Sequence, residues 1–201
     1  MDWSTFGSAV AGAVVGGFLA GYFSLKATQK SHENQVKHSE ENEEKIISGL
    51  LQAIHDEIET VFERYQESMG ARLESLDDGH GLAYYYPLVS DFFNVYNGNS
   101  FLIGRIPNND LRKQIVRTYT LAKGMIDSYR MNNDLVSKWE FSEKLYAESQ
   151  LEVHKNQAIA HYSALVDYAK ILKDSHKTLK QEVSALLREL RKNGVLNEKN
   201  N

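Results

Sequence analysis

Six basic residues between positions 105 and 130 are the side chains best suited to bind a ligand. Residues 104–131 hold these six against two acids, a local balance of +4 in a chain whose net charge is −4. Arginine can pair with a phosphate through two parallel hydrogen bonds and can stack on a base. We therefore predict an anionic ligand, such as a nucleotide, at a basic strip made of Arg105, Arg112, Lys113, Arg117, Lys123 and Arg130.

An alternative role for the basic strip is structural. Residues 26–76 hold eleven acidic and six basic side chains, a balance of −5. If the two segments pack antiparallel, the arginines would pair with the acids of residues 46–76, because close opposite charges attract. The composition leaves both roles open. They are compatible if an oligomer gathers several copies around one central basin.

Other residue types that perform chemistry form no recognisable constellation. The chain has no cysteine, which excludes disulfides, thiolate zinc sites and cysteine nucleophiles. Its seven histidines show no spacing typical of metal ligands. Glycine-rich phosphate loops, nucleophile elbows and H-E-x-x-H motifs are absent from the sequence. We therefore expect a protein that is not an enzyme and has neither a cofactor nor a metal.

The N-terminal segment has the composition of a membrane anchor. No side chain from Trp3 to Leu25 is charged, and a helix of this length covers the roughly 30 Å of a bilayer core. Asp2 makes the start acidic, unlike a signal peptide. Lys26 and Lys30 follow the segment, and positive residues stay cytoplasmic. This predicts a single-pass protein of the bacterial inner membrane, with its N-terminus outside and its remaining residues in the cytoplasm.

Small residues recur at intervals of four within this segment. The pattern lets helix backbones approach closely in a lipid bilayer, so it favours a homo-oligomer over an inert tether. In an oligomer the same residues would either hold a dimer together or line a narrow pore. The candidates for association or pore lining are Ser8, Gly12, Gly16, Gly17, Ala20, Gly21 and Ser24.

The rest of the chain reads as helices. Residues 26–45 are polar and suit a helical stalk, and apolar residues recur every three or four positions over 46–76. Residues 77–81 break the pattern, and Pro87 suits the start of a helix to about 106. Asn97-Gly98 leaves a β-hairpin over 92–103 open as an alternative. We favour helix, since every neighbouring segment is helical.

Two long helical segments complete the expected fold. Asn109 or Asp110 would cap the first of them, and the second would bend near Ser175 and end at Gly194. The fold class is thus predicted to be all-α, with one transmembrane helix, a polar helical stalk and a cytoplasmic helical bundle. The corresponding domains are 1–25, 26–45 and 46–194, with a flexible tail over 195–201.

The middle of the chain resembles a group of uncharacterised bacterial proteins with one N-terminal membrane helix. The residues that carry this resemblance are Tyr85–Pro87, Phe92–Asn99, Ile103–Ile106, Leu111-Arg112 and Ile126–Asn133. The small-residue anchor, the helical domain and the basic strip also resemble the membrane-channel effector of Hailong-type anti-phage defence systems. This second resemblance implies a channel held shut by DNA oligomers, which a nucleotidyltransferase encoded nearby would supply.

Two functions follow as expectations. The first is an oligomeric membrane effector whose pore is gated by an anionic ligand on the cytoplasmic domain. The second is a non-conducting membrane adaptor or scaffold that clusters a partner protein.

Overall fold

The computed structural model describes the backbone of residues 3–88 and 92–195, and the side chains of residues 24–88 and 92–195. The chain divides into two units, Met1–Ile47 and Ser48–Asn201. The first unit holds the N-terminal part of helix α1, Trp3–Tyr65. Its side chains from Ser24 to Ile46 are all exposed, as a polar sequence requires.

The described residues form helices and no strand. After α1 come a π-helical turn η1 (Gln66–Gly70) and α2 (Ala71–Glu74), then α3 (Asn94–Gly98), α4 (Ser100–Ile103), α5 (Asn109–Ser149) and α6 (Glu152–Lys192). The all-α prediction is confirmed, and so is the choice of helix over hairpin for residues 92–103.

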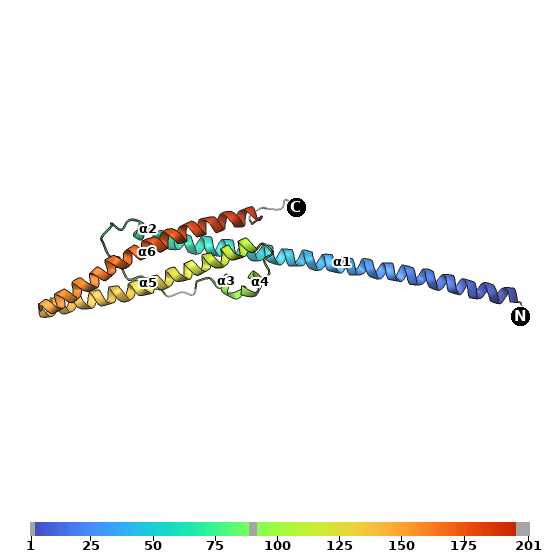
Figure 1. The fold of residues 1–201 in the computed structure, drawn as a ribbon, viewed down its shortest axis with the longest axis horizontal. Helices are drawn as coiled ribbons and strands as arrows, with labels where there is room; N and C mark the ends of the chain where they lie inside the picture. Colours follow the sequence, from blue (N-terminus) through green and yellow to red (C-terminus); the bar gives the residue numbers. More distant parts are fainter. Residues whose placement is uncertain (1–2, 89–91, 196–201) are drawn as a thin grey trace. The chain divides into compact units, whose positions relative to one another are not determined.

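Three long helices build the second unit. Helices α5 and α6 run antiparallel side by side (Figure 1), with Arg117 of α5 bonded to Glu182 of α6. The part of α1 after Ile47 packs on both, because Glu57 bonds Tyr119 of α5 and Glu59 bonds Arg191 of α6. The core between the helices includes Ile54, Ile58, Ile115, Val136, Leu165, Leu172, Val183, Leu186 and Leu190.

Local signals explain where α5 and α6 begin and end. The Asn108 side chain accepts hydrogen bonds from the amides of Asp110 and Leu111, so the cap lies one residue before the predicted position. Gln150 adopts a left-handed conformation between the two helices. Gly194, with φ +86°, follows α6 as expected. The predicted bend near Ser175 is wrong: α6 is continuous, since no Gly or Pro interrupts it.

The helix predicted to start at Pro87 is also wrong in its first part. The described residues between α2 and α3 are largely irregular, and α3 begins only at Asn94, after Phe93 with φ +74°. Long-range contacts replace local ones in this segment. The Asn133 side chain bonds both the amide and the carbonyl of Tyr86, at 2.9 and 2.7 Å. Asn132 donates to the carbonyls of Leu82 and Tyr84.

The predicted membrane span needs correction. Among the residues that the structure describes, no helix combines the length and apolarity that crossing a membrane requires. Crossing the bilayer core takes about twenty consecutive apolar residues in one helix. The finding contradicts the prediction of a single-pass protein in the bacterial inner membrane with an outer N-terminus and a cytoplasmic domain.

Candidate functional site

The structure does not gather the predicted basic strip into one basin. Arg112 donates to the Ile106 carbonyl at 2.8 Å, and Lys123 donates to the Asn97 side chain at 2.8 Å. Arg117 instead reaches Glu182 of α6 at 2.7 Å. Six residues along a helix turn it by about 240°, so Arg117 and Lys123 point about 120° apart. These cations therefore serve two different contacts of α5.

The remaining members of the strip lie on the surface of the domain. Arg130 pairs with Asp127 at 2.5 Å, one turn earlier on α5. The Arg105 guanidinium lies 5.9 Å from the Phe101 ring centre, and Lys113 is exposed. Binding of nucleotides or DNA oligomers by this strip stays a prediction.

The basic strip does form an ion pair between helices, but with a different helix from the one expected. Arg117 pairs with Glu182 of α6 rather than with an acid of residues 46–76. Two of those acids pair with α6 as well: Glu59 with Arg191 at 2.9 Å, and Glu74 with Lys180 at 2.6 Å. Helix α6 therefore supplies the partners of both segments.

Most of the small-residue candidates lie outside the described side chains. These are Ser8, Gly12, Gly16, Gly17, Ala20 and Gly21. Ser24 is described, and it is exposed. Its carbonyl accepts a hydrogen bond from the Thr28 hydroxyl at 2.9 Å. Association through these residues stays a prediction.

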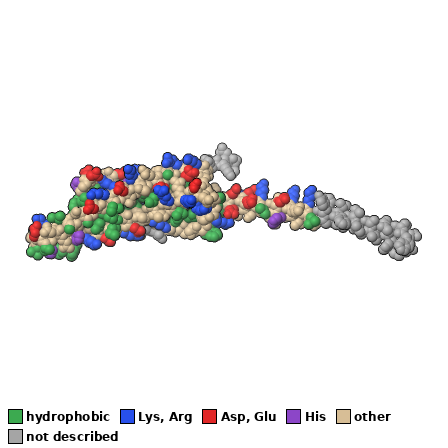
Figure 2. All heavy atoms as spheres, viewed as in Figure 1, with side chains coloured by type: hydrophobic (Ala, Val, Ile, Leu, Met, Phe, Trp, Pro, Cys, Tyr) green, Lys and Arg blue, Asp and Glu red, His purple; other side chains and the backbone are tan. Residues whose placement is uncertain are grey.

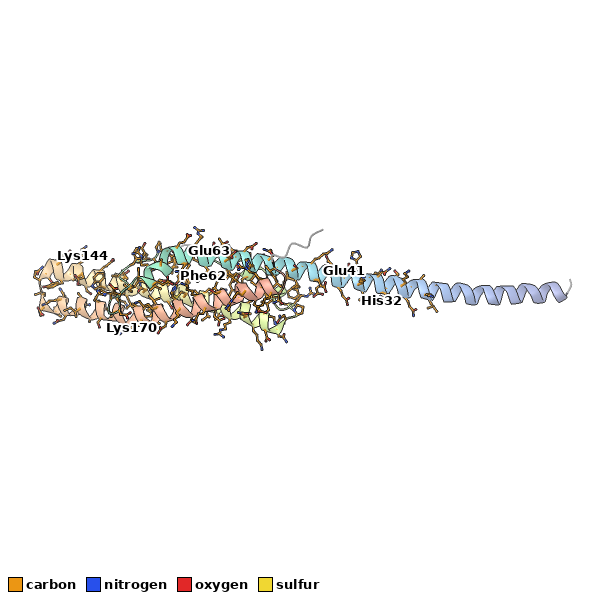
Figure 3. All side chains as sticks on the ribbon, turned by 90° about the horizontal axis from the view of Figure 1, so that it is seen from above. His32, Glu41, Phe62, Glu63, Lys144 and Lys170 are labelled. Carbon is orange, nitrogen blue, oxygen red and sulfur yellow. The ribbon has the colours of Figure 1, made fainter. Side chains whose placement is uncertain are left out.

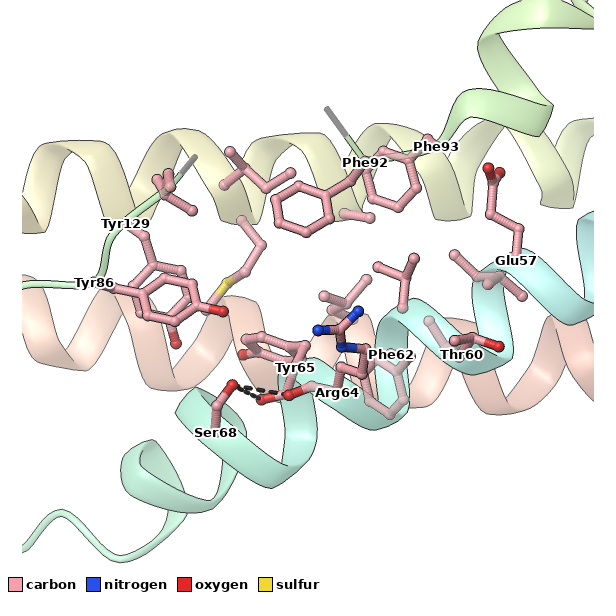
Figure 4. Close-up of a pocket in the computed structure, with 18 of the residues that line it drawn as sticks. Glu57, Thr60, Phe62, Arg64, Tyr65, Ser68, Tyr86, Phe92, Phe93 and Tyr129 are labelled. Atoms are coloured by element: carbon pink, nitrogen blue, oxygen red, sulfur yellow. Dashed lines mark hydrogen bonds between the residues drawn. The ribbon is translucent and has the colours of Figure 1, made fainter. Parts of the chain in front are cut away.

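A cavity of about 550 Å³ opens between α1, α5, α6 and residues 86–88 and 92–94 (Figure 4). Its size lies within the usual range for small-molecule sites. Phe62 lines it from α1, whereas the neighbouring Glu63 is exposed. The apolar lining comes mainly from Phe62, Tyr65, Tyr86, Phe92, Met125 and Tyr129.

Two polar groups of this lining have no partner within the described part of the chain. The Tyr129 hydroxyl is buried and makes no hydrogen bond. Burial, and then the nearby Tyr65 hydroxyl, raises the pKa of Tyr129. Arg64 is exposed, and its guanidinium lies on the cavity side of α1 (Figure 4). Leaving a buried hydroxyl unpaired costs about 1–3 kcal/mol.

A chain of hydrogen bonds runs from Tyr65 to the surface. The Tyr65 hydroxyl lies 2.7 Å from Nδ1 of His176, whose Nε2 lies 3.0 Å from the Glu74 carboxylate. The hydrogen bond from Lys180, and then that from His176, lowers the pKa of Glu74 to about 2. Glu74 is thus ionised at neutral pH, which orients the His176 Nε2 proton toward it. Nδ1 then accepts, so Tyr65 donates its own proton to His176.

This orientation has a consequence for the cavity. Burial raises the pKa of Tyr65 to about 12, so its hydroxyl stays protonated at neutral pH. Because the Tyr65 proton is directed to His176, its oxygen is left as an acceptor. The unpaired hydroxyl of Tyr129 is a donor. The Tyr129 oxygen is fully buried, however, so this donor is not accessible from the cavity.

The opposite end of the cavity holds a fully engaged carboxylate. Glu57 accepts hydrogen bonds from the amides of Val95 and Tyr96 at 2.6 and 3.2 Å, and from the Tyr119 hydroxyl at 2.8 Å. It thus caps α3, which has no cap of its own at Phe93. Figure 4 shows Glu57 and Tyr129 at opposite ends of the lining. The role of Glu57 is structural.

The far end of the α5–α6 pair has an unusual distribution of polarity. We call residues 137–163 the distal hairpin. Its seam holds polar pairs: Ser142 lies 2.8 Å from His161, and Ser149 lies 2.7 Å from His154. Hydrophobic side chains gather on its outside (Figure 2), with Phe141, Leu151, Val153 and Ile159 exposed by more than half.

Neither Ser–His pair resembles an activated nucleophile. Each hydroxyl donates its proton to a backbone carbonyl, Ser142 to Lys138 and Ser149 to Leu145. Because each hydroxyl proton is hydrogen-bonded to a carbonyl, it does not point at the histidine. The histidine is therefore not placed to act as the base that activates the serine. Within residues 24–88 and 92–195, no group of three or more acidic, histidine or cysteine side chains is placed to hold a metal ion. The absence of enzymatic activity stays a prediction.

Sequence reasoning did not find Arg64, Tyr65, Tyr129 or His176. Tyr65 and His176 are 111 residues apart, and no local pattern relates them. Arg64 follows the acidic Glu63 on a helix surface, so from sequence it reads as a solvated charge. Only the packing of α1 against α5 and α6 brings Arg64, Tyr65 and Tyr129 around one cavity and places His176 beside Tyr65.

Comparisons with protein-family models, with curated proteins and with solved structures found no match to this chain.

Proposed function

We propose that this protein is a non-enzymatic scaffold that self-associates through its distal hairpin. The observation that carries the proposal is the inverted polarity of that hairpin, with serine and histidine in the seam and large apolar side chains outside.

Leaving the large apolar side chains of the distal hairpin in water costs free energy. Phe141 is 61% exposed and Val153 is 64% exposed. Burying a Phe or Val side chain fully stabilises a protein by about 1.5–3 kcal/mol relative to leaving it in water. Large apolar side chains that are exposed together at one end of a helix pair are candidates for an interaction site. A partner that covers the outside of the hairpin would recover this energy.

Charge favours a second copy as that partner. The distal hairpin carries three lysines and four glutamates, so its formal net charge is −1 with neutral histidines. Both signs are interspersed on its surface, for example Lys144 and Glu148, 4.0 Å apart on α5. Lys144 and Lys170 point outward from the helix pair (Figure 3). A symmetric dimer contacts the same patch on both copies, and a patch of low net charge does not repel itself.

Self-association would place two bundles at the ends of one joint helical assembly. A scaffold works by such placement, because linking two binding modules raises the effective concentration of whatever they hold. Clustering of a partner protein, including a nucleotidyltransferase encoded nearby, belongs to this proposal as its next step.

The oligomeric state tests the proposal directly. We expect the full chain to behave as a dimer in light scattering coupled to size-exclusion chromatography. Replacing both Phe141 and Val153 by Ser should give a monomer, because it removes two large apolar contacts. The matched control is Phe101→Ser, since Phe101 is 77% exposed but lies on α4. This control should leave the dimer intact.

Cysteine crosslinking gives a second measurement. The chain contains no cysteine, so Phe141→Cys introduces a single thiol. We expect oxidation to link two copies through this residue, and Phe101→Cys to remain unlinked. A monomeric wild-type chain, or a Phe141/Val153 variant that is still a dimer, would overturn the proposal. Gly16→Ile is the informative third variant: loss of the dimer there alone would assign association to the small-residue stripes instead.

A further inference from the structure

The two histidines in the seam of the distal hairpin have a defined tautomer. The hydroxyls of Ser142 and Ser149 donate their protons to backbone carbonyls of α5. A hydroxyl has a single proton, so each serine oxygen can only accept a hydrogen bond from the histidine beside it. Nδ1 of His161 lies 2.8 Å from the oxygen of Ser142, and Nδ1 of His154 lies 2.7 Å from that of Ser149. Both Nδ1 atoms must therefore carry the proton.

This tautomer leaves Nε2 of each histidine with a free lone pair. Within the described residues, the hydrogen bonds of both rings are made by Nδ1. Both side chains are half-buried, and neither Nε2 atom is among the buried polar atoms that lack a partner, so both are open to solvent. A neutral imidazole nitrogen of this kind is the commonest metal ligand in proteins.

Histidines that bind metal ions are held in the same way. Their second ring nitrogen donates to a carboxylate, a carbonyl or water, which fixes the ring and raises the basicity of the ligating nitrogen. Here the serine oxygens accept that hydrogen bond, and the Lys138 carbonyl lies 3.1 Å from Nδ1 of His161 as a second acceptor. Imidazole suits zinc, copper and nickel, whereas magnesium prefers oxygen ligands.

One copy of the chain cannot complete a metal site with these two residues. His154 and His161 are seven residues apart on α6, so they lie about 10 Å apart along the helix and within about 20° of each other around it. Zinc ligands lie about 2 Å from the ion, so a single ion cannot reach both. Within the described part of one copy, no set of three acidic or histidine side chains is gathered either. The second ligand must come from another molecule.

A second copy of the distal hairpin can supply that ligand symmetrically. Around a two-fold axis, a contact from one residue to another is repeated in reverse. If two α6 helices pack antiparallel, His154 of each copy meets His161 of the other. Val153 precedes His154 and Phe141 precedes Ser142, so both apolar side chains lie on the same side of the antiparallel α5–α6 pair. Both are exposed there.

We propose that the distal hairpin binds zinc between His154 of one copy and His161 of the other, with two such ions in a dimer. This inference rests on the proposed self-association and adds its ligand, because the ions link copies that the apolar side chains bring together. Water fills the remaining positions of each tetrahedral ion. The sequence-based expectation of no metal came from histidine spacing within one copy, and such spacing does not reveal a site shared between two copies.

Zinc titration of the full chain tests the site. Isothermal titration calorimetry with zinc chloride should show binding of one ion per copy. Light scattering over a dilution series should show the dimer dissociation constant falling at least about tenfold in saturating zinc, because a ligand that binds only the dimer stabilises it by mass action. A chelator should reverse the change, and magnesium chloride should not produce it.

Replacement of the histidines by asparagine isolates the ligand atom. An asparagine N–H can still donate to the serine oxygen, but no atom takes the place of Nε2. His154→Asn and His161→Asn should each abolish the effect of zinc, because each removes one ligand from both sites, and the metal-free dimer should persist. The matched control replaces His32 and His38, which are exposed on α1, by asparagine. It should retain the full effect of zinc.

The tautomer provides a test that does not depend on self-association. Nitrogen-15 spectra of the histidine side chains, recorded without metal, should show the proton of the neutral ring on Nδ1 in both His154 and His161. A proton on Nε2 of either residue would overturn the proposal.

The outcomes separate the zinc site from self-association itself. A metal-free dimer that zinc does not tighten would overturn the zinc site alone. A zinc effect that survives both histidine variants would place the ion elsewhere and would also overturn it. A chain that is monomeric without zinc and dimeric with it would retain the zinc site and overturn association through the apolar side chains. A monomer under both conditions would overturn both proposals.

Discussion

At the scale of single residues, Glu57 connects α1 to both α3 and α5. One carboxylate replaces the missing cap of α3 and satisfies the buried Tyr119 hydroxyl. We expect Glu57→Gln to lower the free energy of unfolding by about 1–3 kcal/mol, because hydrogen bonds to a charged acceptor are the stronger ones. Urea unfolding followed by circular dichroism measures this change. The control is the exposed Glu63→Gln, which should change stability by less than about 0.5 kcal/mol.

Glu74 gives the domain a pH dependence with a defined sign. Its hydrogen bond from Lys180, and then that from His176, lowers its pKa from 4.5 to about 2. The folded state therefore prefers the ionised carboxylate. Its stabilising contribution is complete above pH 4.5 and is lost as the pH falls toward 2. Carboxyl chemical shifts followed by NMR should show Glu74 titrating near 2.

The control for this pH effect is the variant Glu74→Gln. Glutamine cannot ionise, so this variant lacks the stabilisation that ionised Glu74 provides. Its free energy of unfolding should therefore be lower than that of the wild type above pH 4.5, and the two should become equal as the pH falls toward 2. A titration midpoint of Glu74 near 4.5 in the folded protein would contradict the contacts with Lys180 and His176.

At the scale of elements, Gly81 sets how closely the segment between α2 and α3 approaches α6. A Cβ atom at Gly81 would lie 2.8 Å from the Leu165 Cβ and 3.1 Å from its backbone carbonyl carbon. Backbone cannot yield as a flexible side chain can. We expect Gly81→Ala to destabilise the domain by about 1–3 kcal/mol, as overpacking does.

Gly124 is the matched control for this substitution. A Cβ there meets nothing within 4 Å, and the residue lies inside α5. Gly124→Ala should stabilise the domain by about 0.5–1 kcal/mol, because alanine favours helix. Thermal unfolding of the two variants should therefore shift in opposite directions. A Gly81→Ala variant as stable as the wild type would show that the segment moves away from α6 at little cost.

The helices illustrate what could be predicted from sequence. Apolar periodicity and the cap signals around Asn108 and Gly194 predicted α5 and the end of α6, since these depend on neighbours in the chain. The irregular path before Asn94 could not be predicted. It depends on Glu57, Asn132 and Asn133, which lie 37 or more residues away. The cavity was missed for the same reason, because its walls come from separate helices.

At the scale of the whole molecule, the distal hairpin should be dispensable for folding. Among the described residues, its side-chain hydrogen bonds, such as those of Ser142 and Ser149, stay within residues 137–163. We expect replacement of residues 137–163 by a short glycine-rich loop to change Tm by less than about 8 °C. Calorimetry measures this, and light scattering should show a monomer.

A large loss of stability in this deletion would mean that the hairpin supports the bundle. The Phe141/Val153 variant, which keeps the helices intact, then separates folding from association.

The contact of Glu57 with α3 also determines how the domain opens. Amides in the first turn of a helix normally exchange their hydrogens rapidly with solvent, because no helical carbonyl protects them. The amides of Val95 and Tyr96 are held by a side chain of α1 instead. Their exchange with deuterium should therefore be slow and should report separation of α1 from α3 rather than fraying of α3 itself. The exchange rates of these two amides therefore measure how often the bundle opens in the native state.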